Sequence, residues 1–183
     1  VMGEGGGFLV LERQDAAASR GARILAEMSL PGLTSEAYNI MSPEPGGSGM
    51  AATMRAALDL AGIDPGEISY INAHGTSTVL NDLCEARAIR AVFGGAVDRI
   101  PVSSTKAVTG HCLAGAAGVE AAVCVKAIVE QIIPPSANLA DPDPELGILL
   151  APGSPSRARV DHVMSNSFAF GGHNGVCIFS RRS

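Results

Sequence analysis

The sequence is poor in aromatic side chains and has little net charge. It contains no tryptophan, Phe and Tyr together make up 4% of its 183 residues, and its formal net charge is −5. Nucleic acids bind to basic surfaces, and single strands also stack on aromatic side chains. The composition therefore argues against a protein that binds nucleic acid.

Long hydrophobic runs are also missing. A membrane-spanning helix needs roughly 20 consecutive apolar residues. The longest apolar stretch, residues 115–131, is interrupted by Glu120, Lys126 and Glu130. No basic segment precedes an apolar one near the first residue, as it would in a signal peptide. We therefore expect no membrane span and a cytoplasmic location.

Cysteine is scarce, and its spacing matches no known metal or disulfide pattern. The four cysteines are Cys84, Cys112, Cys124 and Cys177, and no two of them form a CxxC pair. Free cysteines in apolar or helical surroundings behave as small buried hydrophobes. The acidic run Asp141, Asp143 and Glu145 has no further ligand beside it. We expect reduced thiols and no metal site.

Patterns typical of strands and helices alternate along the chain. The sequence predicts strands over residues 7–12, 24–30, 67–73 and 99–104, and a final pair within 161–182 that meets at a Gly-Gly turn. It predicts helices over 13–22, 50–61, 83–93 and 115–131, with loops over 34–49 and 132–147. This alternation is typical of a layered α/β fold with a mixed sheet.

Three of the predicted helices carry further information. The helix over 50–61 has apolar residues at helical spacing and ends at Gly62, which favours a helix C-terminus. Asp82 and Glu85 predict a capping box for the helix that Gly94 ends. The helix over 115–131 is apolar nearly all round, so we expect other elements to cover most of it.

Three loops share a composition of polar residues beside Gly, Ser and Thr, each just after a predicted strand. They are NAHGTST, SSTKAVTGH and SNSFAFGGHN. A single histidine at a strand end is more often a core residue than a catalytic one. Binding sites in α/β sheets, however, gather beyond strand ends. We therefore predict that four polar residues converge there, namely His74, Lys106, His111 and Asn174.

Two imidazoles and an ammonium group favour chemistry that develops negative charge. Neutral histidines that donate through Nε2–H could stabilise a thioester oxygen or an enolate. Lys106 would add positive potential and help keep both imidazoles neutral. The glycines of FGG would allow a backbone N–H to approach the substrate. The set lacks a nucleophile, because no Cys or Ser lies in a recognisable nucleophile setting.

Together, the three motifs resemble the C-terminal half of the β-ketoacyl–acyl carrier protein synthases, condensing enzymes of the thiolase superfamily. VMGEGGGFLVLE resembles the segment that opens this half, so the resemblance covers residues 1–183. It implies a layered α-β-α fold with a mixed five-stranded sheet and a buried central helix. It also implies no intrinsic cofactor, since substrates are carried on the phosphopantetheine of acyl carrier protein.

The resemblance implies a decarboxylative condensation in fatty acid or polyketide synthesis. A cysteine of the N-terminal half takes an acyl group from its thioester. Malonyl-acyl carrier protein then loses carbon dioxide, and the carbanion attacks the acyl-cysteine to give a 3-oxoacyl product. That half and its cysteine are absent from this chain. We therefore expect a partner chain that supplies them, acyl carrier protein as a second partner, and a dimer of full units.

The resemblance also assigns roles to individual residues. His74 and His111 would hold the malonyl thioester, Lys106 would order the site, and Glu120 would be linked to Lys106. Phe170 would supply a backbone oxyanion donor and a gate. The expected substrate-binding residues are Thr76 and Thr78, on the pantetheine arm, and Gly171, Gly172 and Asn174.

The sequence departs from the family pattern at several positions. Ala169 replaces a usual glycine, His173 a frequent threonine, and Met41 a threonine that binds pantetheine in some members. The segment HCLAGAAG shifts the small-residue pattern by one place. These changes favour a specialised synthase as much as a housekeeping one. Cys112, beside His111, is interpreted as a small helix-start residue and not as the nucleophile.

Two other functions remain open. The chain could be a non-catalytic subunit that resembles a chain-length factor, or an inactive fragment. The presence of both histidines and the lysine argues against this, because a subunit without chemistry does not need them. A thiolase-type enzyme that uses coenzyme A is the other alternative, but STKAVTGH fits carrier-protein synthases better.

Overall fold

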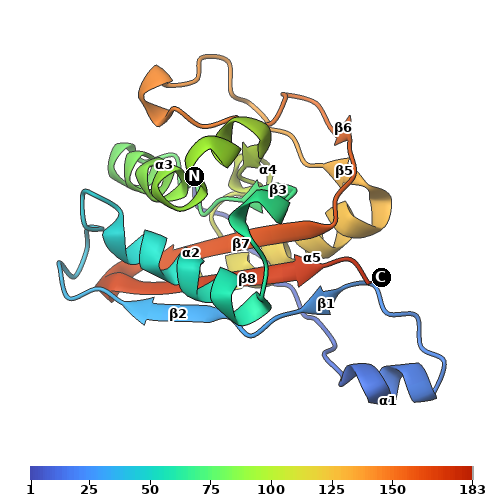
Figure 1. The fold of residues 1–183 in the computed structure, drawn as a ribbon. Coiled ribbons are helices and arrows are strands. Elements are labelled where there is room, and N and C mark those ends of the chain that lie inside the picture. The colour runs from blue at the N-terminus through green and yellow to red at the C-terminus, as the bar shows by residue number, and fades with distance from the viewer. Residues whose placement is uncertain (183) are drawn as a thin grey trace.

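The computed structural model describes residues 1–182 and contains a mixed α/β arrangement (Figure 1). The helices are α1 (Gln14–Ser19), α2 (Ser48–Ala61), α3 (Val79–Phe93), α4 (Lys106–Thr109) and α5 (Ala116–Glu130). The strands are β1 (Glu27–Met28), β2 (Gly32–Ser35), β3 (Tyr70–Asn72), β4 (Val102–Ser103), β5 (Ile132–Ile133), β6 (Ser156–Arg157), β7 (His162–Ala169) and β8 (His173–Ser180). No helix among the described residues is both long and apolar enough to cross a membrane.

The main sheet is mixed, as predicted, but it has six strands instead of the predicted five. Its order is β1-β8-β7-β3-β4, and β2 pairs with the same strand as β1, so six strands fill five positions. β3 runs parallel to both β4 and β7, whereas β7 and β8 form an antiparallel hairpin. The carboxyl ends of β3, β4 and β7 therefore lie at one edge of the sheet. β5 and β6 form a separate antiparallel pair.

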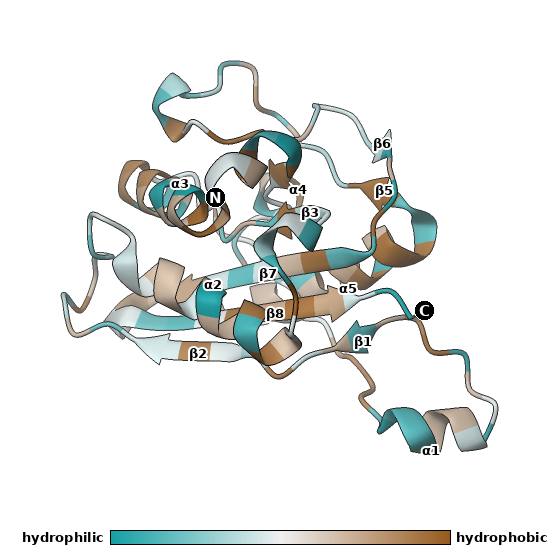
Figure 2. Cartoon of the chain, in the orientation of Figure 1, coloured by the Kyte–Doolittle hydropathy of each residue, from teal (hydrophilic) through white to brown (hydrophobic). Residues whose placement is uncertain are grey.

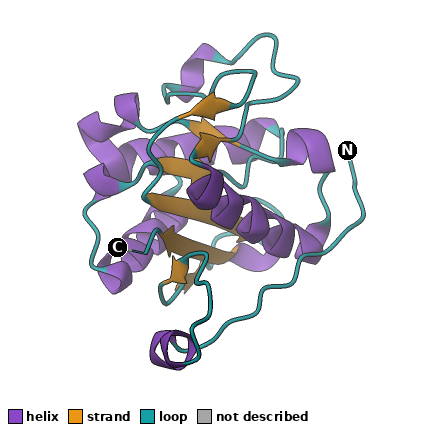
Figure 3. Ribbon diagram, turned by 90° about the vertical axis from the view of Figure 1, so that its right-hand side faces the viewer, coloured by secondary structure: helices purple, strands orange, loops and turns teal. Residues whose placement is uncertain are grey.

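Helices cover both faces of the sheet (Figures 1 and 3). Met164 and Phe168 of β7 pack into one apolar cluster with residues of α2 and α3. Val163, on the opposite face of the same strand, packs into a second cluster with Cys124 of α5. This alternation is the two-residue period of a strand that is buried on both faces. The α-β-α layering is confirmed.

Helix α2 shows how the sequence pattern becomes packing. Its buried residues are Met50, Ala51, Thr53, Met54, Ala57 and Leu58. They lie at helical spacing on one side, and Figure 2 shows the helix carrying both hydrophobic and hydrophilic segments. Gly62 follows at φ 65°, a left-handed conformation that glycine adopts without a steric penalty. The predicted helix and its end are therefore confirmed.

The predicted capping box at the start of α3 is wrong. The helix begins at Val79, so Asp82 and Glu85 lie inside it. The Glu85 carboxylate instead accepts hydrogen bonds from the backbone N–H groups of His74 and Gly75, each at 2.9 Å. A carboxylate can bind donors of a distant loop as readily as those of its own helix end. Sequence spacing alone does not distinguish the two.

The predicted strand over residues 7–12 is also wrong, because residues 3–13 have no regular secondary structure. A strand needs a neighbouring edge to pair its backbone groups, and none of the described elements offers one here. Phe8 and Val10 accordingly remain 98% and 97% exposed. Of the strand predicted over 24–30, only β1 (Glu27–Met28) forms. β2 (Gly32–Ser35) begins after Pro31, which lacks the N–H that a ladder requires, and it extends into the loop predicted over 34–49.

Candidate active site

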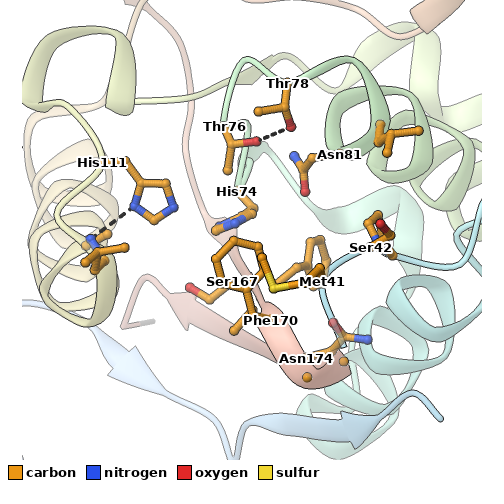
Figure 4. A pocket seen from close by; sticks show the side chains of 18 of the residues that line it. Met41, Ser42, His74, Thr76, Thr78, Asn81, His111, Ser167, Phe170 and Asn174 are labelled. Atoms are coloured by element: carbon orange, nitrogen blue, oxygen red, sulfur yellow. Dashed lines mark hydrogen bonds between the residues drawn. The ribbon is translucent and has the colours of Figure 1, made fainter. Parts of the chain in front are cut away.

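The predicted loops meet at one edge of the sheet. Because β3, β4 and β7 run parallel, the loops that carry His74, Lys106 and Phe170 all leave from the same side. The His74 and His111 rings face each other edge to face, with centroids 5.5 Å apart and an angle of 86° between their planes. Figure 4 shows both imidazoles beside the same cavity. The predicted convergence of the two histidines is confirmed.

A cavity of about 1000 Å³ opens at this edge. Most of the predicted site residues line it, namely His74, Thr76, Thr78, His111, Phe170, Gly171, Gly172 and Asn174. Met41 and Met50 lie in its wall as well. Met50, interpreted from sequence as a core residue, therefore borders both the core and the cavity. Lys106 and Glu120 are the predicted site residues that do not reach this cavity.

Lys106 and Glu120 form a buried ion pair behind the histidines. Their side chains are only 5% and 2% exposed. Burial raises the pKa of Glu120, and the attraction of the Lys106 ammonium opposes that rise. Lys106 also borders a second cavity of about 540 Å³, which touches His111 and Thr76. The positive charge of Lys106 nevertheless lowers the pKa of both imidazoles.

His74 is held deep in the site and is kept neutral. Burial lowers its pKa to about 3, and the positive charge of Lys106 and the neighbouring His111 contribute further. Its backbone N–H is bonded to Glu85, and its ring packs edge-on against Phe168 with centroids 6.0 Å apart. The buried Nδ1 atom has no hydrogen-bond partner among residues 1–182. At physiological pH this imidazole is uncharged.

His111 is half-buried, and a backbone contact defines its tautomer. The N–H of Leu113 donates to Nδ1 of the imidazole at 3.1 Å (Figure 4). When neutral, the ring therefore carries its proton on Nε2. Burial and the charge of Lys106 lower the pKa of His111. Leu113 reaches this geometry at φ 51°, a left-handed conformation that is rare for a leucine.

Glu85 is the residue of this site that sequence analysis missed. Besides the amides of His74 and Gly75, its carboxylate accepts a hydrogen bond from Asn166 Nδ2 at 3.0 Å. Burial raises the pKa of Glu85, and these donors oppose the rise. A usable signal was present, because Asn81, Glu85 and Ile89 share one buried stripe of α3. An acid within a buried stripe is rare without partners.

The turn that carries Phe170 is tied to the loop before α2. The N–H of Gly171 donates to the carbonyl of Ile40 at 2.8 Å. The N–H of Glu36 donates to the carbonyl of Gly172 at 2.7 Å. Gly171 and Gly172 have φ values of 77° and 75°. A Cβ on Gly172 would lie 2.4 Å from the Glu36 carbonyl oxygen, so only glycine fits there. The turn leaves the Phe170 ring 67% exposed at the cavity mouth.

The remaining polar residues complete the rim. The hydroxyls of Thr76 and Thr78 lie 2.8 Å apart. The Asn174 amide donates to Glu36 Oε1 at 2.8 Å. His173 is exposed and lies outside the residues that line the cavity.

None of the cysteines in the described chain lines the cavity. All four are free thiols, and burial raises the pKa of Cys124 to about 12. Such a thiol is a poor nucleophile at neutral pH. Among residues 1–182, no group of three or more His, Cys, Asp and Glu side chains is placed to hold a metal ion.

The fold is thiolase-like, as it is in solved ketosynthase structures. Comparison with known proteins identifies the family. Residues 25–140 match the family described as β-ketoacyl synthase, C-terminal domain. The chain therefore belongs to the β-ketoacyl synthases and corresponds to their C-terminal half. Residues 1–24 lie outside the matched range.

Individual relatives agree with this assignment. The chain is 47% identical over 181 residues to 3-oxoacyl-[acyl-carrier-protein] synthase 2 of Synechocystis sp., which covers 99% of this chain and 44% of that protein. Among solved structures, the ishigamide ketosynthase/chain length factor matches 100% of this chain and 44% of its own, with a TM-score of 0.95 and 38% identity. A type II polyketide ketosynthase in complex with its acyl-carrier protein matches 94% of this chain and 42% of its own, with a TM-score of 0.91 and 32% identity. The chain thus spans less than half the length of these relatives.

Proposed function

We propose that this chain is the malonyl-binding half of a β-ketoacyl–acyl carrier protein synthase. The assembled enzyme condenses an acyl thioester with malonyl-acyl carrier protein and releases 3-oxoacyl-acyl carrier protein and carbon dioxide. The observation that carries the proposal is the pair of facing imidazoles, both with lowered pKa values, at the wall of a large cavity. Two neutral N–H donors suit an oxygen on which negative charge develops.

The chemical step follows from this pair. As the malonyl C–C bond breaks, carbon dioxide leaves and the bonding electrons move toward the thioester oxygen, which becomes an enolate. His111 donates from Nε2, because Leu113 occupies its Nδ1. His74 donates from the facing ring, and the positive charge of Lys106 stabilises the enolate further. The enolate carbon then attacks the carbonyl of the acyl-cysteine. A C–C bond forms, the C–S bond breaks, and the cysteine leaves as a thiolate.

The nucleophilic cysteine comes from the N-terminal half of the enzyme, in a partner chain or joined to this one. That half, acyl carrier protein and a second full unit are the proposed partners. Thr76 and Thr78 at the rim bind the pantetheine arm, which brings the substrate without any cofactor of the enzyme itself. Phe170 serves as the gate and, through its backbone N–H, as an oxyanion donor, and the following glycines allow the backbone to approach the substrate closely. The four free thiols favour a reducing compartment such as the cytoplasm.

One observation favours a second candidate, a non-catalytic subunit that resembles a chain-length factor. A solved neighbour with a TM-score of 0.95 is described as a ketosynthase/chain length factor. The matched chain belongs to a protein described by both subunit types, so the likeness in fold does not separate the two candidates. The neutral histidine pair and the buried Lys106 support the catalytic candidate, because they serve no purpose in a subunit that only shapes a cavity.

Two measurements test the proposal. Intact-mass spectrometry of the assembled enzyme, before and after cerulenin, should show the inhibitor on the chain or segment that holds the partner half and never on residues 1–183. Release of carbon dioxide from malonyl-acyl carrier protein should fall about 100-fold or more in His74→Ala and in His111→Ala. His173→Ala is the matched control, because His173 lies outside the cavity. Equal release from all four proteins would contradict catalysis and support the chain-length-factor candidate.

A further inference from the structure

The backbone N–H and carbonyl of His111 are hydrogen-bonded to Val1 and Gly3. The His111 N–H donates to the carbonyl of Val1 at 2.9 Å, and the His111 carbonyl accepts from the N–H of Gly3 at 3.1 Å. Met2 and His111 accordingly form an isolated parallel bridge. We call residues 1–7 the glycine arm. His111 lies on no strand of the main sheet, so the arm provides the sheet-like support that its loop otherwise lacks.

The arm lies against this loop and the start of α5 with backbone directly on backbone. A Cβ on Gly3 would fall 2.3 Å from the carbonyl oxygen of Thr109, and a Cβ on Gly7 would fall 2.3 Å from that of Gly118. Seen from the other side, a Cβ on Gly115 would fall 2.1 Å from the Gly5 carbonyl oxygen. Backbone atoms cannot rotate away as a flexible side chain can. A side chain at Gly3 or Gly7 would therefore force the arm and the loop apart.

We propose that the glycine arm is a positioning element for His111, and that it fixes the imidazole relative to His74. The inference rests on the proposed function, because His111 must then face the malonyl thioester. Val1 and Met2 of the arm also line the cavity, but the proposed action of the arm is through its hydrogen bonds to the His111 backbone. An added methyl group on Gly3 or Gly7 would move the loop and spoil the alignment of the two rings, although every side chain of the cavity would remain.

The arm contains its own control. Gly6 lies between the contacting glycines, and a Cβ there would have no atom of the described chain within 4 Å. In the assembled enzyme, Gly3→Ala should lower malonyl decarboxylation by about 10-fold or more, since a displacement near 1 Å is enough for such a loss. Gly7→Ala, farther from His111, should lower it less. Gly6→Ala should stay within about twofold of the unmodified enzyme, and acyl transfer to the partner's cysteine should stay within about twofold in all variants.

A second variant separates positioning from general damage. In a His111→Ala background, Gly3→Ala should cause no further loss of decarboxylation, because the group that the arm positions is already gone. An equal additional loss in that background would overturn the proposal. So would a Gly3→Ala enzyme with full decarboxylation, or a Gly6→Ala enzyme that is as impaired as Gly3→Ala.

A readout independent of activity distinguishes failure of this inference from failure of the proposed function. In this chain, the His111 backbone amide should be protected from hydrogen exchange by its bond to Val1, and its NMR signal is assigned from a His111→Ala sample. Gly3→Ala should shift this signal and speed its exchange, whereas Gly6→Ala should not. An unchanged signal in Gly3→Ala overturns the inference. A changed signal, with no decarboxylation by the unmodified enzyme, supports the arm contact and contradicts the proposed function.

Discussion

The two histidine loops face the same cavity but are supported differently. The His74 loop follows β3 in the interior of the sheet, and Glu85 of α3 binds its two successive amides. The His111 loop follows the short helix α4 and is bound by Val1 and Gly3 of the arm. One histidine loop is thus held by a helix of the core and the other by residues 1–3. The two supports can therefore be altered separately.

The electrostatic environment is what the two loops share. Burial comes first among the causes that lower each histidine pKa, and the charge of Lys106 comes second for both. His74 is the more deeply buried of the two. Variants that remove the Lys106 charge should affect both loops. Variants of Glu85 should affect only the His74 loop, and variants of the glycine arm only the His111 loop.

The largest effect is expected when the shared charge is removed. Lys106→Met leaves the Glu120 carboxylate buried without its partner and should lower the free energy of unfolding by about 3–5 kcal/mol. Lys106→Met combined with Glu120→Leu should recover most of this loss, because no buried charge is left. Urea unfolding of the single and double variants measures both. A single variant as stable as the unmodified protein would show that the ion pair is not buried.

The next effect concerns the support of His74 alone. Glu85→Gln replaces a carboxylate that accepts several buried donors with an amide that has one accepting oxygen, and should cost about 1–3 kcal/mol of stability. The His74 amide should exchange faster, whereas the His111 amide should not change. Glu130→Gln on the exposed end of α5 is the matched control and should leave both stability and the exchange of the two histidine amides unchanged. Faster exchange at both histidines would show that the two loops are not independently supported.

Acid should destabilise the fold through His74. Its folded pKa is about 3 and its unfolded value about 6.5, so on acidification the unfolded chain takes up this proton first. The contribution of His74 to the free energy of unfolding falls by at most about 1.4 kcal/mol per pH unit as the pH decreases from about 6.5 to about 3. Glu85 and Glu120 have raised pKa values, and their contributions are lost in the opposite direction, as pH rises.

Comparing the unmodified chain with His74→Asn isolates the contribution of His74 to the pH dependence of stability. Urea unfolding across pH 4–7 should show a shallower acid dependence for His74→Asn than for the unmodified chain. His173→Asn, at the exposed histidine, should keep the original slope. Identical slopes for all three would mean that His74 titrates normally in the fold.

The smallest effect tests a strained residue in each loop. Ser77 in the His74 loop and Leu113 in the His111 loop both have positive φ, at 61° and 51°. Replacing either with glycine should change stability by no more than about 1 kcal/mol, because strain relief opposes the greater freedom of the unfolded chain. Decarboxylation should fall only in Leu113→Gly, whose N–H no longer sits in a defined place beside His111. An equal fall in Ser77→Gly would remove this distinction between the loops.

Much of the candidate site could be predicted because its residues follow strands. His74, Lys106 and the Phe170 turn each lie just after a strand, and parallel pairing brings such positions to one edge. Lys106 was expected at the cavity but lies behind it, because its ammonium is bound to Glu120. Glu85 was misassigned because its donors belong to a loop 10 and 11 residues away, beyond the reach of a capping pattern.

Local patterns in the sequence by themselves determined the helix α2 with its glycine end, the Gly-Gly hairpin of β7 and β8, and the motifs that mark the family. These depend on the spacing of apolar residues and on backbone preferences that act over a few positions. Only the tertiary structure decided the neutral state of His74, the Nε2–H tautomer of His111 and the support of each loop. Those properties arise from desolvation and from hydrogen bonds between segments far apart in the chain, which no local pattern records.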